Sequence, residues 1–356
     1  MCDPKSILVV RLSSLGDVVM TLPAVYALKK HFPHWKLHWV CEGSAYELLS
    51  CVEFVDETIR FPRERIVDFL KRGKILGALR VIRDFFVYIR KKEFDLIIDF
   101  HGILKSGLIS FLSKKKRVIG FGKPYAKEFS GIFYDERVNG SDPFLHKVER
   151  NMLIVRHLKA DESYENIPFR ISGEDEEYIQ KFFHEKGLDK VVFAINPFSS
   201  IKGAYKRWPL ENYRILAERI NREIGANVIV LWGTHEEKKE AERLRSATNG
   251  KVVVSCPTNV PQLLALLGKV DMYIGGDSGV THLASLAGTP LVAIFGPSDY
   301  RINSPYGPDK RIIRKRIACS PCKKRDCEDR KCLTSIEPEH VFHVVKSFYS
   351  EKAGKK

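Results

Sequence analysis

The segment 11–17 combines an aspartate with hydroxyl groups directly after an apolar run. It reads Arg-Leu-Ser-Ser-Leu-Gly-Asp and joins residues 7–11, which have the pattern of a buried strand, to a helical pattern that starts at Val18. In an open α/β sheet ligands bind beyond the carboxyl ends of the strands, so this polar loop is a candidate site and Asp17 is its candidate functional residue. Aspartate is also among the best N-cap residues of a helix, and the spacing leaves both roles open. The segment lacks the G-x-G-x-x-G pattern of dinucleotide-binding sites.

A second polar turn follows a later apolar run. Residues 275–284 read Gly-Gly-Asp-Ser-Gly-Val-Thr-His-Leu-Ala, which is typical of a strand, a glycine-rich turn and the start of a helix. The first N–H groups of a helix have no partner within the helix and attract anions such as a diphosphate. The candidate ligand-binding residues are therefore Asp277, Ser278, Gly279, Val280, Thr281 and His282. The alternative is structural, with Asp277 as a turn residue and His282 as a packed helix residue.

Two further loops after apolar runs carry polar side chains. Ser199 and Ser200 follow the run 191–196, and Lys206 comes a few residues later. Hydroxyl groups and an ammonium group can hold phosphate oxygens. Glu236 follows another such run, where its carboxylate could accept the two hydroxyl groups of a ribose. The alternatives are an ordinary solvent-facing loop for the first segment and an acidic helix cap for the second.

Four of the eight cysteines lie within fourteen residues, in the spacing C-x2-C-x4-C-x4-C. Thiolates in such a cluster can bind zinc or iron, and a C-x2-C pair is a common ligand spacing. The candidate ligands are Cys319, Cys322, Cys327 and Cys332. Because four protein ligands leave no open position, the metal would be structural. Free thiols and disulfides are the alternatives, and a reducing compartment disfavours disulfides.

Alternating strands and helices must position these residues. Apolar, β-branched runs predict strands at residues 7–11, 37–41, 96–100 and 117–121 in the first half, and at 191–196, 227–232, 251–255, 272–275 and 291–295 in the second. Helical patterns lie between them. This alternation predicts an α/β protein with two Rossmann-like domains that face each other across a cleft.

The length of 356 residues is enough for two cores. We expect an N-terminal domain at residues 1–170 and a C-terminal domain at residues 171–356. The last helical pattern, residues 338–349, is expected to pack back on the first domain.

The chain is basic, and its charge is unevenly distributed. The formal net charge is +15; residues 60–127 hold eighteen Lys and Arg against six Asp and Glu, and residues 301–332 hold eleven against four. Clustered positive charge attracts nucleic acid, anionic lipid headgroups or phosphorylated sugars. The helical pattern at 66–92 is basic and amphipathic, which is typical of a membrane-surface helix. A core-packing helix with a basic outer face is the alternative.

Composition narrows the class of protein. Hydrophobic residues make up 44% and charged residues 29%, which is ordinary for a folded globular chain. No apolar run approaches the roughly 20 residues of a membrane-spanning helix, and no export signal is visible in the first residues. We therefore expect a cytoplasmic protein. A basic, non-enzymatic RNA-binding protein is the alternative of another class, although no signature of an RNA-binding module accompanies the charge.

Three segments together resemble the ADP-heptose:lipopolysaccharide heptosyltransferases. They are residues 7–23, the run Lys206-Arg207-Trp208-Pro209, and residues 277–284 continuing to Phe295-Gly296-Pro297. The resemblance spans nearly the whole chain in the same order. It extends to residues 94–106, where the family commonly reads Asp-x-Gln-Gly and this chain has His101 in place of the glutamine.

The resemblance implies an inverting glycosyltransferase of the GT-B architecture, with the acceptor on the first domain and ADP-heptose on the second. Asp17 matches the general base of the family. The donor-binding positions of the family are matched by Ser199, Ser200, Lys206, Glu236 and the segment from Asp277 to His282. The match of Glu236 to the ribose-binding acid has an uncertainty of one residue. We find no Asp-x-Asp pair on a loop that would hold Mg²⁺ against a diphosphate. No cofactor is therefore expected to be required for catalysis.

The acceptor that the resemblance implies is the inner core of lipopolysaccharide, at the cytoplasmic face of the inner membrane. Its Kdo sugars carry carboxylates and its lipid A carries phosphates, so basic side chains are expected to bind it. The expected acceptor-binding residues are Ser14, Gly16, Arg60, Arg63, His101 and Lys105. Kdo and a first heptose stay open as acceptors, and so does another glycan or a surface protein. The segment 66–92 is expected to face the anionic membrane, and no nucleic-acid partner is expected.

Overall fold

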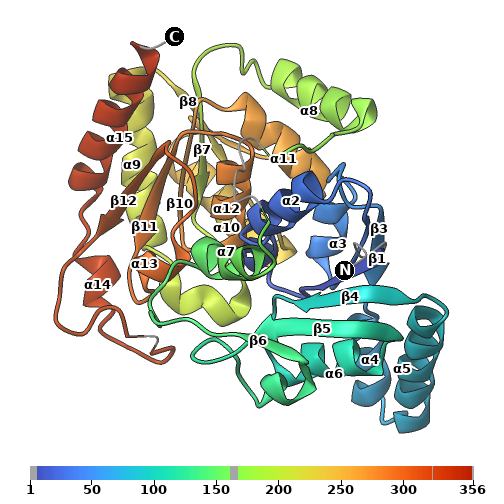
Figure 1. The fold of residues 1–356 in the computed structure, drawn as a ribbon. Coiled ribbons are helices and arrows are strands. Elements are labelled where there is room, and N and C mark those ends of the chain that lie inside the picture. The colour runs from blue at the N-terminus through green and yellow to red at the C-terminus, as the bar shows by residue number, and fades with distance from the viewer. Residues whose placement is uncertain (1–5, 161–166, 323, 355–356) are drawn as a thin grey trace. The chain divides into compact units, whose positions relative to one another are not determined.

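Two parallel sheets of six strands each form the framework of the chain (Figure 1). The computed structural model describes residues 6–160, 167–322 and 324–354. Contacts divide the chain into unit 1, Met1–Arg170, and unit 2, Ile171–Lys356. Each unit contains one of the sheets, with helices between successive strands. The predicted α/β fold class is confirmed.

Unit 1 alternates strands with helices. Its strands are β1 (Ser6–Val10), β2 (Lys36–Cys41), β3 (Glu57–Arg60), β4 (Phe94–Asp99), β5 (Lys115–Phe121) and β6 (Glu136–Val138). Its helices are α1 (Leu15–Val19), α2 (Leu22–His31), α3 (Ser44–Leu49), α4 (Arg63–Lys71), α5 (Ile75–Arg90), α6 (Leu104–Leu112), the 3₁₀ turn η1 (Ser130–Phe133) and α7 (Lys147–His157). The sequence patterns did not predict β3 and β6, because these strands are short and carry charged residues.

Unit 2 repeats this alternation. Its strands are β7 (Val192–Asn196), β8 (Asn227–Val230), β9 (Val252–Val254), β10 (Met272–Gly276), β11 (Leu291–Phe295) and β12 (Lys310–Arg314). Its helices are α8 (Gly173–Glu185), the 3₁₀ segment η2 (Ile201–Lys206), α9 (Leu210–Ile224), α10 (His235–Ala247), α11 (Val260–Lys269), α12 (Gly279–Leu286), α13 (Tyr300–Asn303), α14 (Lys331–Thr334) and α15 (Pro338–Ala353). All five strands predicted in this half are present, and β12 is additional.

Both sheets have the same strand order. The order is β3-β2-β1-β4-β5-β6 in unit 1 and β12-β11-β10-β7-β8-β9 in unit 2, and every strand pair is parallel. In such a sheet the direction of winding reverses between the first and fourth strands, and ligands bind beyond the carboxyl ends of the strands at that point. The reversal lies between β1 and β4 in unit 1 and between β7 and β10 in unit 2.

The central strands are buried because helices cover both faces of each sheet. In unit 1, Phe85 and Ile89 of α5 and Ile109 of α6 form one core cluster with the alternate residues Leu8 and Val10 of β1. On the other face α2 packs against α7. Figure 1 shows α5 and α6 on one side of β4 and β5. Alternation of side chains between the two faces gives each face of β1 an apolar surface to bury.

The basic segment 66–92 forms two helices joined by a turn at Gly73. No side chain of α4 is buried, whereas α5 buries a stripe that includes Val81, Phe85 and Ile89. Only one side of this helical pair therefore contributes to the core. In the described residues, no helix combines the length and apolarity needed to cross a membrane.

The last helix contributes to the core of unit 2. Val341, Phe342, Val345 and Phe348 of α15 are buried in the core of unit 2, and the helix packs on α9. Its apolar face completes the core of its own unit. A contact of this helix with the first domain stays a prediction.

Candidate active site

Asp17 lies in the first turn of α1, directly beyond the carboxyl end of β1. The N-cap of this helix is Ser14, and Asp17 is the third helical residue, so the predicted start at Val18 was too late. The Asp17 carboxylate accepts hydrogen bonds from the Ser14 amide (3.2 Å) and the Ser14 hydroxyl (2.8 Å), both at Oδ2. This is the acidic half of a capping box. Capping of the helix, the structural role that the sequence left open for Asp17, is therefore shared by Ser14 and Asp17.

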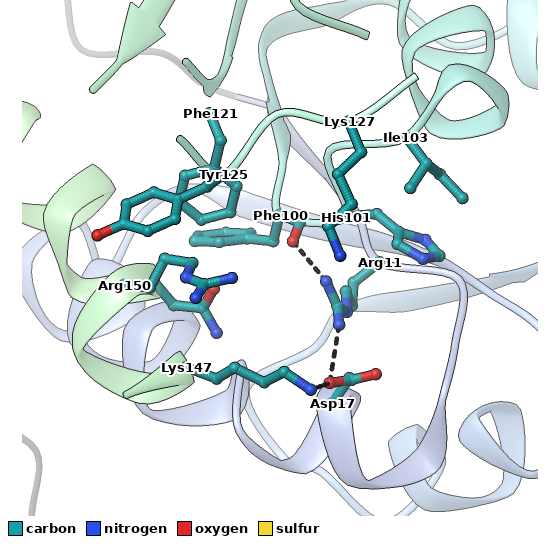
Figure 2. Close-up of a pocket in the computed structure, with 11 residues that line it drawn as sticks. Arg11, Asp17, Phe100, His101, Ile103, Phe121, Tyr125, Lys127, Lys147 and Arg150 are labelled. Atoms are coloured by element: carbon teal, nitrogen blue, oxygen red, sulfur yellow. Dashed lines mark hydrogen bonds and ion pairs between the residues drawn. The ribbon is translucent and has the colours of Figure 1, made fainter. Parts of the chain in front are cut away.

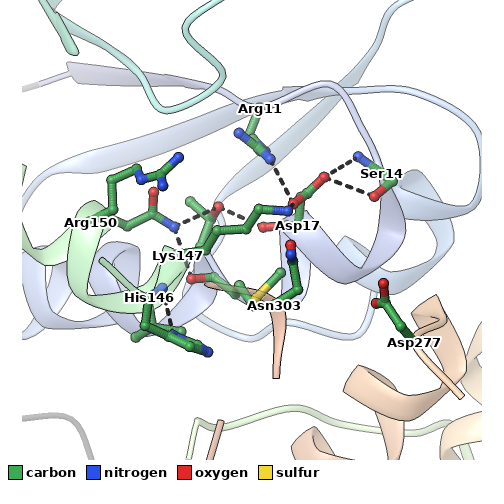
Figure 3. Close-up of polar contacts among 12 residues, drawn as sticks. Arg11, Ser14, Asp17, His146, Lys147, Arg150, Asp277 and Asn303 are labelled. Carbon is green, nitrogen blue, oxygen red and sulfur yellow. Dashed lines mark hydrogen bonds and ion pairs between the residues drawn. The ribbon is translucent and has the colours of Figure 1, made fainter. Parts of the chain in front are cut away.

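The other carboxylate oxygen of Asp17 contacts two cations (Figure 3). Lys147 Nζ lies 2.6 Å from Oδ1, and an Arg11 guanidinium nitrogen lies 3.2 Å from it. Burial alone would raise the pKa of Asp17, but Arg11 and Lys147 outweigh this effect and hold the pKa far below its usual range. Asp17 is consequently a carboxylate throughout the physiological pH range.

Two long-range contacts hold the cations in place. The Arg11 guanidinium donates to the carbonyl oxygen of Phe100 at 2.7 Å, which ties the end of β1 to the residue after β4. The first residue of α7 is Lys147, and the same helix is fixed by Asn151, whose amide donates to the Met20 carbonyl at 2.9 Å. The network around Asp17 is thus built from three segments that are distant in sequence.

Asp99 shapes the loop after β4. Its Oδ1 accepts the amides of His101 (2.8 Å) and Gly102 (3.1 Å), and its Oδ2 accepts the Tyr134 hydroxyl (2.7 Å). Burial raises the pKa of Asp99. Its role is to set the path of the backbone rather than to contact a ligand, since its side chain is fully buried.

His101 occupies the position at which the sequence departs from the related motif. Burial, with the nearby Arg11, lowers its pKa to about 3, so the imidazole is neutral at pH 7. Its Nδ1 lies 3.4 Å from the Leu12 amide and faces it as an acceptor. A neutral imidazole offers one donor and one acceptor, as a glutamine side chain also does.

A pocket of about 160 Å³ opens beside Asp17 (Figure 2). By volume this is space for roughly five water molecules. Four cationic side chains and one carboxylate line it, together with aromatic rings. The lining residues are Arg11, Asp17, Phe100, His101, Ile103, Phe121, Tyr125, Lys127, Lys147, Arg150 and Asn151. Such a lining favours an anionic group.

The structure separates the predicted acceptor residues into two groups. His101 lines the pocket, Ser14 bonds to Asp17, and Gly16 is buried in α1. Arg63 and Lys105 instead contact the buried carboxylate of Glu42, and Arg60 pairs with Glu64 at 3.0 Å. None of these three lines the pocket among the described residues.

Sequence reasoning missed Lys127, Lys147 and Arg150 as pocket residues. They lie in the segment 122–157, where the patterns predicted no strand or helix. Two basic residues three positions apart at the start of a helix were the available signal, because such residues share one helix face.

The second group of predicted residues gathers at the reversal point of unit 2. Lys206 ends η2 after β7, and Asp277 follows β10; their side chains form an ion pair of 2.7 Å. Burial would raise the pKa of Asp277, but Lys206 outweighs it and the net shift is downward. The structure therefore brings together a lysine and an aspartate that are 71 residues apart.

The neighbouring loops are held by Arg207. Its guanidinium contacts the Ser199 hydroxyl at 3.3 Å and the Glu237 carboxylate at 2.9 Å. Ser200 is exposed and caps η2. Glu237 is thus engaged in an ion pair, whereas Glu236 is exposed at the start of α10.

The start of α12 presents backbone amides beside this ion pair. Ser278 is the N-cap of this helix, and Gly279 and Val280 follow in its first turn. The next two residues, Thr281 and His282, are buried. The Thr281 hydroxyl is used internally, since it lies 3.0 Å from the Tyr273 hydroxyl and donates to the Gly276 carbonyl. Helical geometry leaves the first N–H groups without intrahelical partners, and together with Lys206 they favour an anion.

The cysteine cluster lies elsewhere in unit 2. Cys332 is buried on α14, Cys319 is exposed, and no disulfide joins the four cysteines within the described residues. Burial raises the pKa of Cys332, and each of the other three thiols is near enough to raise it further. Within the described residues, which leave out Lys323, no three His, Cys, Asp or Glu side chains are arranged to hold a metal ion. The metal site stays a prediction of the spacing, and no catalytic step is assigned to it.

Comparisons of the sequence with known proteins all point to heptosyltransferases. The sequence profile of glycosyltransferase family 9 (heptosyltransferase) matches residues 82–333. A lipopolysaccharide core heptosyltransferase of Haemophilus influenzae is 26% identical over 310 residues, covering 85% of this chain and 82% of that protein.

Two solved structures share the fold. A family 9 glycosyltransferase of Veillonella parvula superimposes with a TM-score of 0.82 at 21% identity, covering 98% of each chain. An Escherichia coli heptosyltransferase solved with ADP-2-deoxy-2-fluoro heptose gives 0.75 at 22% identity, covering 96% of this chain and 99% of that one.

Proposed function

Because the chain belongs to glycosyltransferase family 9 (heptosyltransferase), and is therefore a glycosyltransferase of lipopolysaccharide core biosynthesis, we propose that it transfers a heptose from ADP-heptose to the inner core. The observation that carries this proposal is the ionised Asp17 beside a cationic pocket at the reversal point of unit 1. The Escherichia coli structure with an ADP-heptose analogue supports the choice of donor.

The reaction requires a base and a site for the leaving group. A hydroxyl oxygen of the acceptor attacks the anomeric carbon of the heptose, and the bond from that carbon to the diphosphate oxygen breaks. The proton of the hydroxyl passes to Asp17, and the electron pair of the broken bond leaves with ADP. Attack from the face opposite the leaving group inverts the configuration.

Unit 2 supplies positive charge for the departing diphosphate. Lys206 offers an ammonium group, and the first turn of α12 offers backbone N–H groups at the positive end of the helix dipole. Asp277 holds Lys206 in place before the donor binds. Ser199 is tied to Arg207, so it orients that side chain.

We propose further that α4 and α5 contact the anionic surface of a membrane. Leu76 is 82% exposed, and apolar side chains at Leu70, Ile75 and Leu79 are exposed beside it. The same two helices and the residues next to them also expose basic side chains, at Arg65, Lys71, Arg72, Lys74, Arg80, Arg83, Arg90 and Lys91. Exposed leucines within a basic surface match an interfacial helix better than a solvated one.

Turnover with defined acceptors tests the proposed function. Purified protein is incubated with ADP-heptose and either a Kdo-terminated or a heptose-terminated lipid A precursor, and products are identified by mass. Addition of one heptose to one of the two acceptors is expected and names the acceptor. Release of ADP with no transfer to either one would contradict the lipopolysaccharide core as acceptor and favour another glycan or a surface protein.

A further inference from the structure

Both oxygens of the Asp17 carboxylate have close partners. Oδ1 accepts a hydrogen bond from Lys147 at 2.6 Å and forms an ion pair with Arg11 at 3.2 Å, and Oδ2 accepts from the amide and the hydroxyl of Ser14. A carboxylate has about four lone-pair sites. A general base must lie within hydrogen-bond reach of the proton that it removes. One of the present partners therefore has to leave before a sugar hydroxyl can bind to Asp17.

Lys147 is the partner that can leave. Ser14 belongs to the same helical turn as Asp17, and its two contacts form the capping box. Arg11 is anchored by the Phe100 carbonyl, and its side chain is 12% exposed. The Lys147 side chain is 28% exposed, and within the described part of the chain its ammonium group donates a hydrogen bond to Asp17 alone. Its four-carbon stem is flexible, so the ammonium group can swing without a change in the backbone.

The pocket beside Asp17 provides a place for that ammonium group to go. Arg11, Lys127, Lys147 and Arg150 all line it, with Asp17 as the one carboxylate among the lining side chains (Figure 2). Arg150 lies with its guanidinium 4.2 Å from the Tyr125 ring centre, and its buried Nε has no hydrogen-bond partner in the described residues. Buried donors of this kind are costly unless an acceptor reaches them. The pocket is therefore suited to the oxygens of an anionic group.

We propose that Lys147 blocks Asp17 in the unliganded protein, and that an anionic group on the acceptor sugar, seated in this pocket, draws the lysine away and frees the base. This inference rests on the proposed role of Asp17 in glycosyl transfer. Lys147 is then a positioning residue that makes the base available only beside an acceptor carrying carboxylate or phosphate oxygens. A neutral sugar would bind beside an occupied base.

Acceptor preference in Lys147→Met tests this inference. Transfer is measured on a Kdo-terminated acceptor, on the same acceptor with its carboxylates reduced to alcohols, and on a phosphorylated heptose-terminated acceptor. The variant is expected to lose about tenfold in kcat/KM with an anionic acceptor, mainly through KM, because one charge-assisted contact is gone. With the neutral acceptor its kcat is expected to rise at least about threefold above that of the wild-type protein, because the base is no longer occupied.

The controls separate this behaviour from general damage. Lys147→Arg keeps the charge and is expected to retain the preference for an anionic acceptor. Arg156→Met removes an exposed cation at the far end of α7, which pairs with Glu149 at 3.2 Å, and is expected to leave both activities unchanged. A loss in Lys147→Met that is equal for anionic and neutral acceptors would overturn the inference. So would a kcat with the neutral acceptor that stays at the wild-type value.

A binding measurement keeps the inference testable if no transfer is found. Free Kdo, a sugar phosphate and a neutral methyl mannoside are titrated into the wild-type protein and Lys147→Met by calorimetry, without donor. Binding of Kdo or the sugar phosphate that weakens about tenfold in the variant, with no change for the neutral sugar, supports the pocket and shows which oxyanion it takes. Equal binding of all three sugars by both proteins overturns it. Absence of heptosyl transfer by the wild-type protein would contradict only the proposed function.

Discussion

Asp17 serves both the helix and the proposed chemistry, and a single substitution separates the two roles. Asparagine keeps an oxygen that can accept from the Ser14 amide, so Asp17→Asn retains the capping contact. It removes the proton acceptor, and turnover is expected to fall by roughly 10²–10⁴-fold. The measurement is kcat, with ADP affinity and thermal unfolding as controls. Nearly normal turnover in a folded variant would leave Asp17 with a structural role only.

Lys206 is expected to contribute to donor binding through its charge. Lys206→Ala should weaken ADP binding by about 1.5–3 kcal/mol, the usual contribution of a charge-assisted contact. The matched control is Lys202→Ala, which removes an exposed lysine of the same 3₁₀ segment. Calorimetry that gives the same ADP affinity for both variants would remove Lys206 from the donor site.

His101 makes the protein sensitive to acid. Its pKa is lowered from 6.5 to about 3 in the folded chain, so the unfolded chain binds a proton first as the pH falls below 6.5. Stability is therefore complete above pH 6.5 and decreases below it, by at most about 2 kcal/mol at pH 5. His101→Gln should remove this loss, because the amide does not titrate. Urea unfolding of both proteins at pH 7 and pH 5 measures the difference, and an equal pH dependence would show that His101 is already accessible to protons.

At the scale of elements, α5 carries the proposed membrane contact. The double variant Leu76→Gln with Leu79→Gln removes two exposed apolar side chains and no charge. It should bind less to vesicles that contain anionic lipid, while the binding of the wild-type protein should itself weaken at high salt. Ile201→Gln is the matched control, because Ile201 is 88% exposed on η2. Equal flotation of the wild-type protein with neutral and anionic vesicles would contradict the proposal.

The segment 319–332 offers a second test at this scale. If its four cysteines hold a structural ion, as their spacing predicts, protein prepared without chelator should contain about one equivalent of zinc or iron. Removal of the metal should then expose four thiols to a thiol reagent. A content below about a tenth of an equivalent, with four thiols that titrate freely, would assign the segment to free thiols.

At the scale of the whole molecule, the two units have the same sheet topology. Each has six parallel strands in the same order, and each places its polar loops at the point where the winding reverses. Positive charge occurs in both units: basic residues of unit 1 line the pocket and are exposed on α4 and α5, and Lys206 lies at the reversal point of unit 2. The net charge of +15 had also permitted a non-enzymatic RNA-binding protein. The match to a glycosyltransferase family favours an enzyme over that alternative.

The sequence determined the features that depend on local pattern. Alternating apolar runs predicted the strands that form the centre of each sheet, because a buried parallel strand needs a continuous apolar segment. The loop that contains Asp17 and the turn that contains Asp277 could be recognised for the same reason: each directly follows such a strand. Short edge strands such as β3 and β6 were not predicted, since their pairing depends on neighbours in space.

Only the tertiary structure decided the electrostatic state of the site. Lys147 reaches Asp17 across 130 residues of sequence, and Arg11 reaches the residue after β4 because β1 and β4 are neighbours in the sheet. A pKa depends on distances through space and on burial, and neither quantity is encoded in the spacing of residues along the chain. The sequence could therefore single out Asp17 as a candidate base, whereas only the fold decided that Lys147 and Arg11 contact its carboxylate.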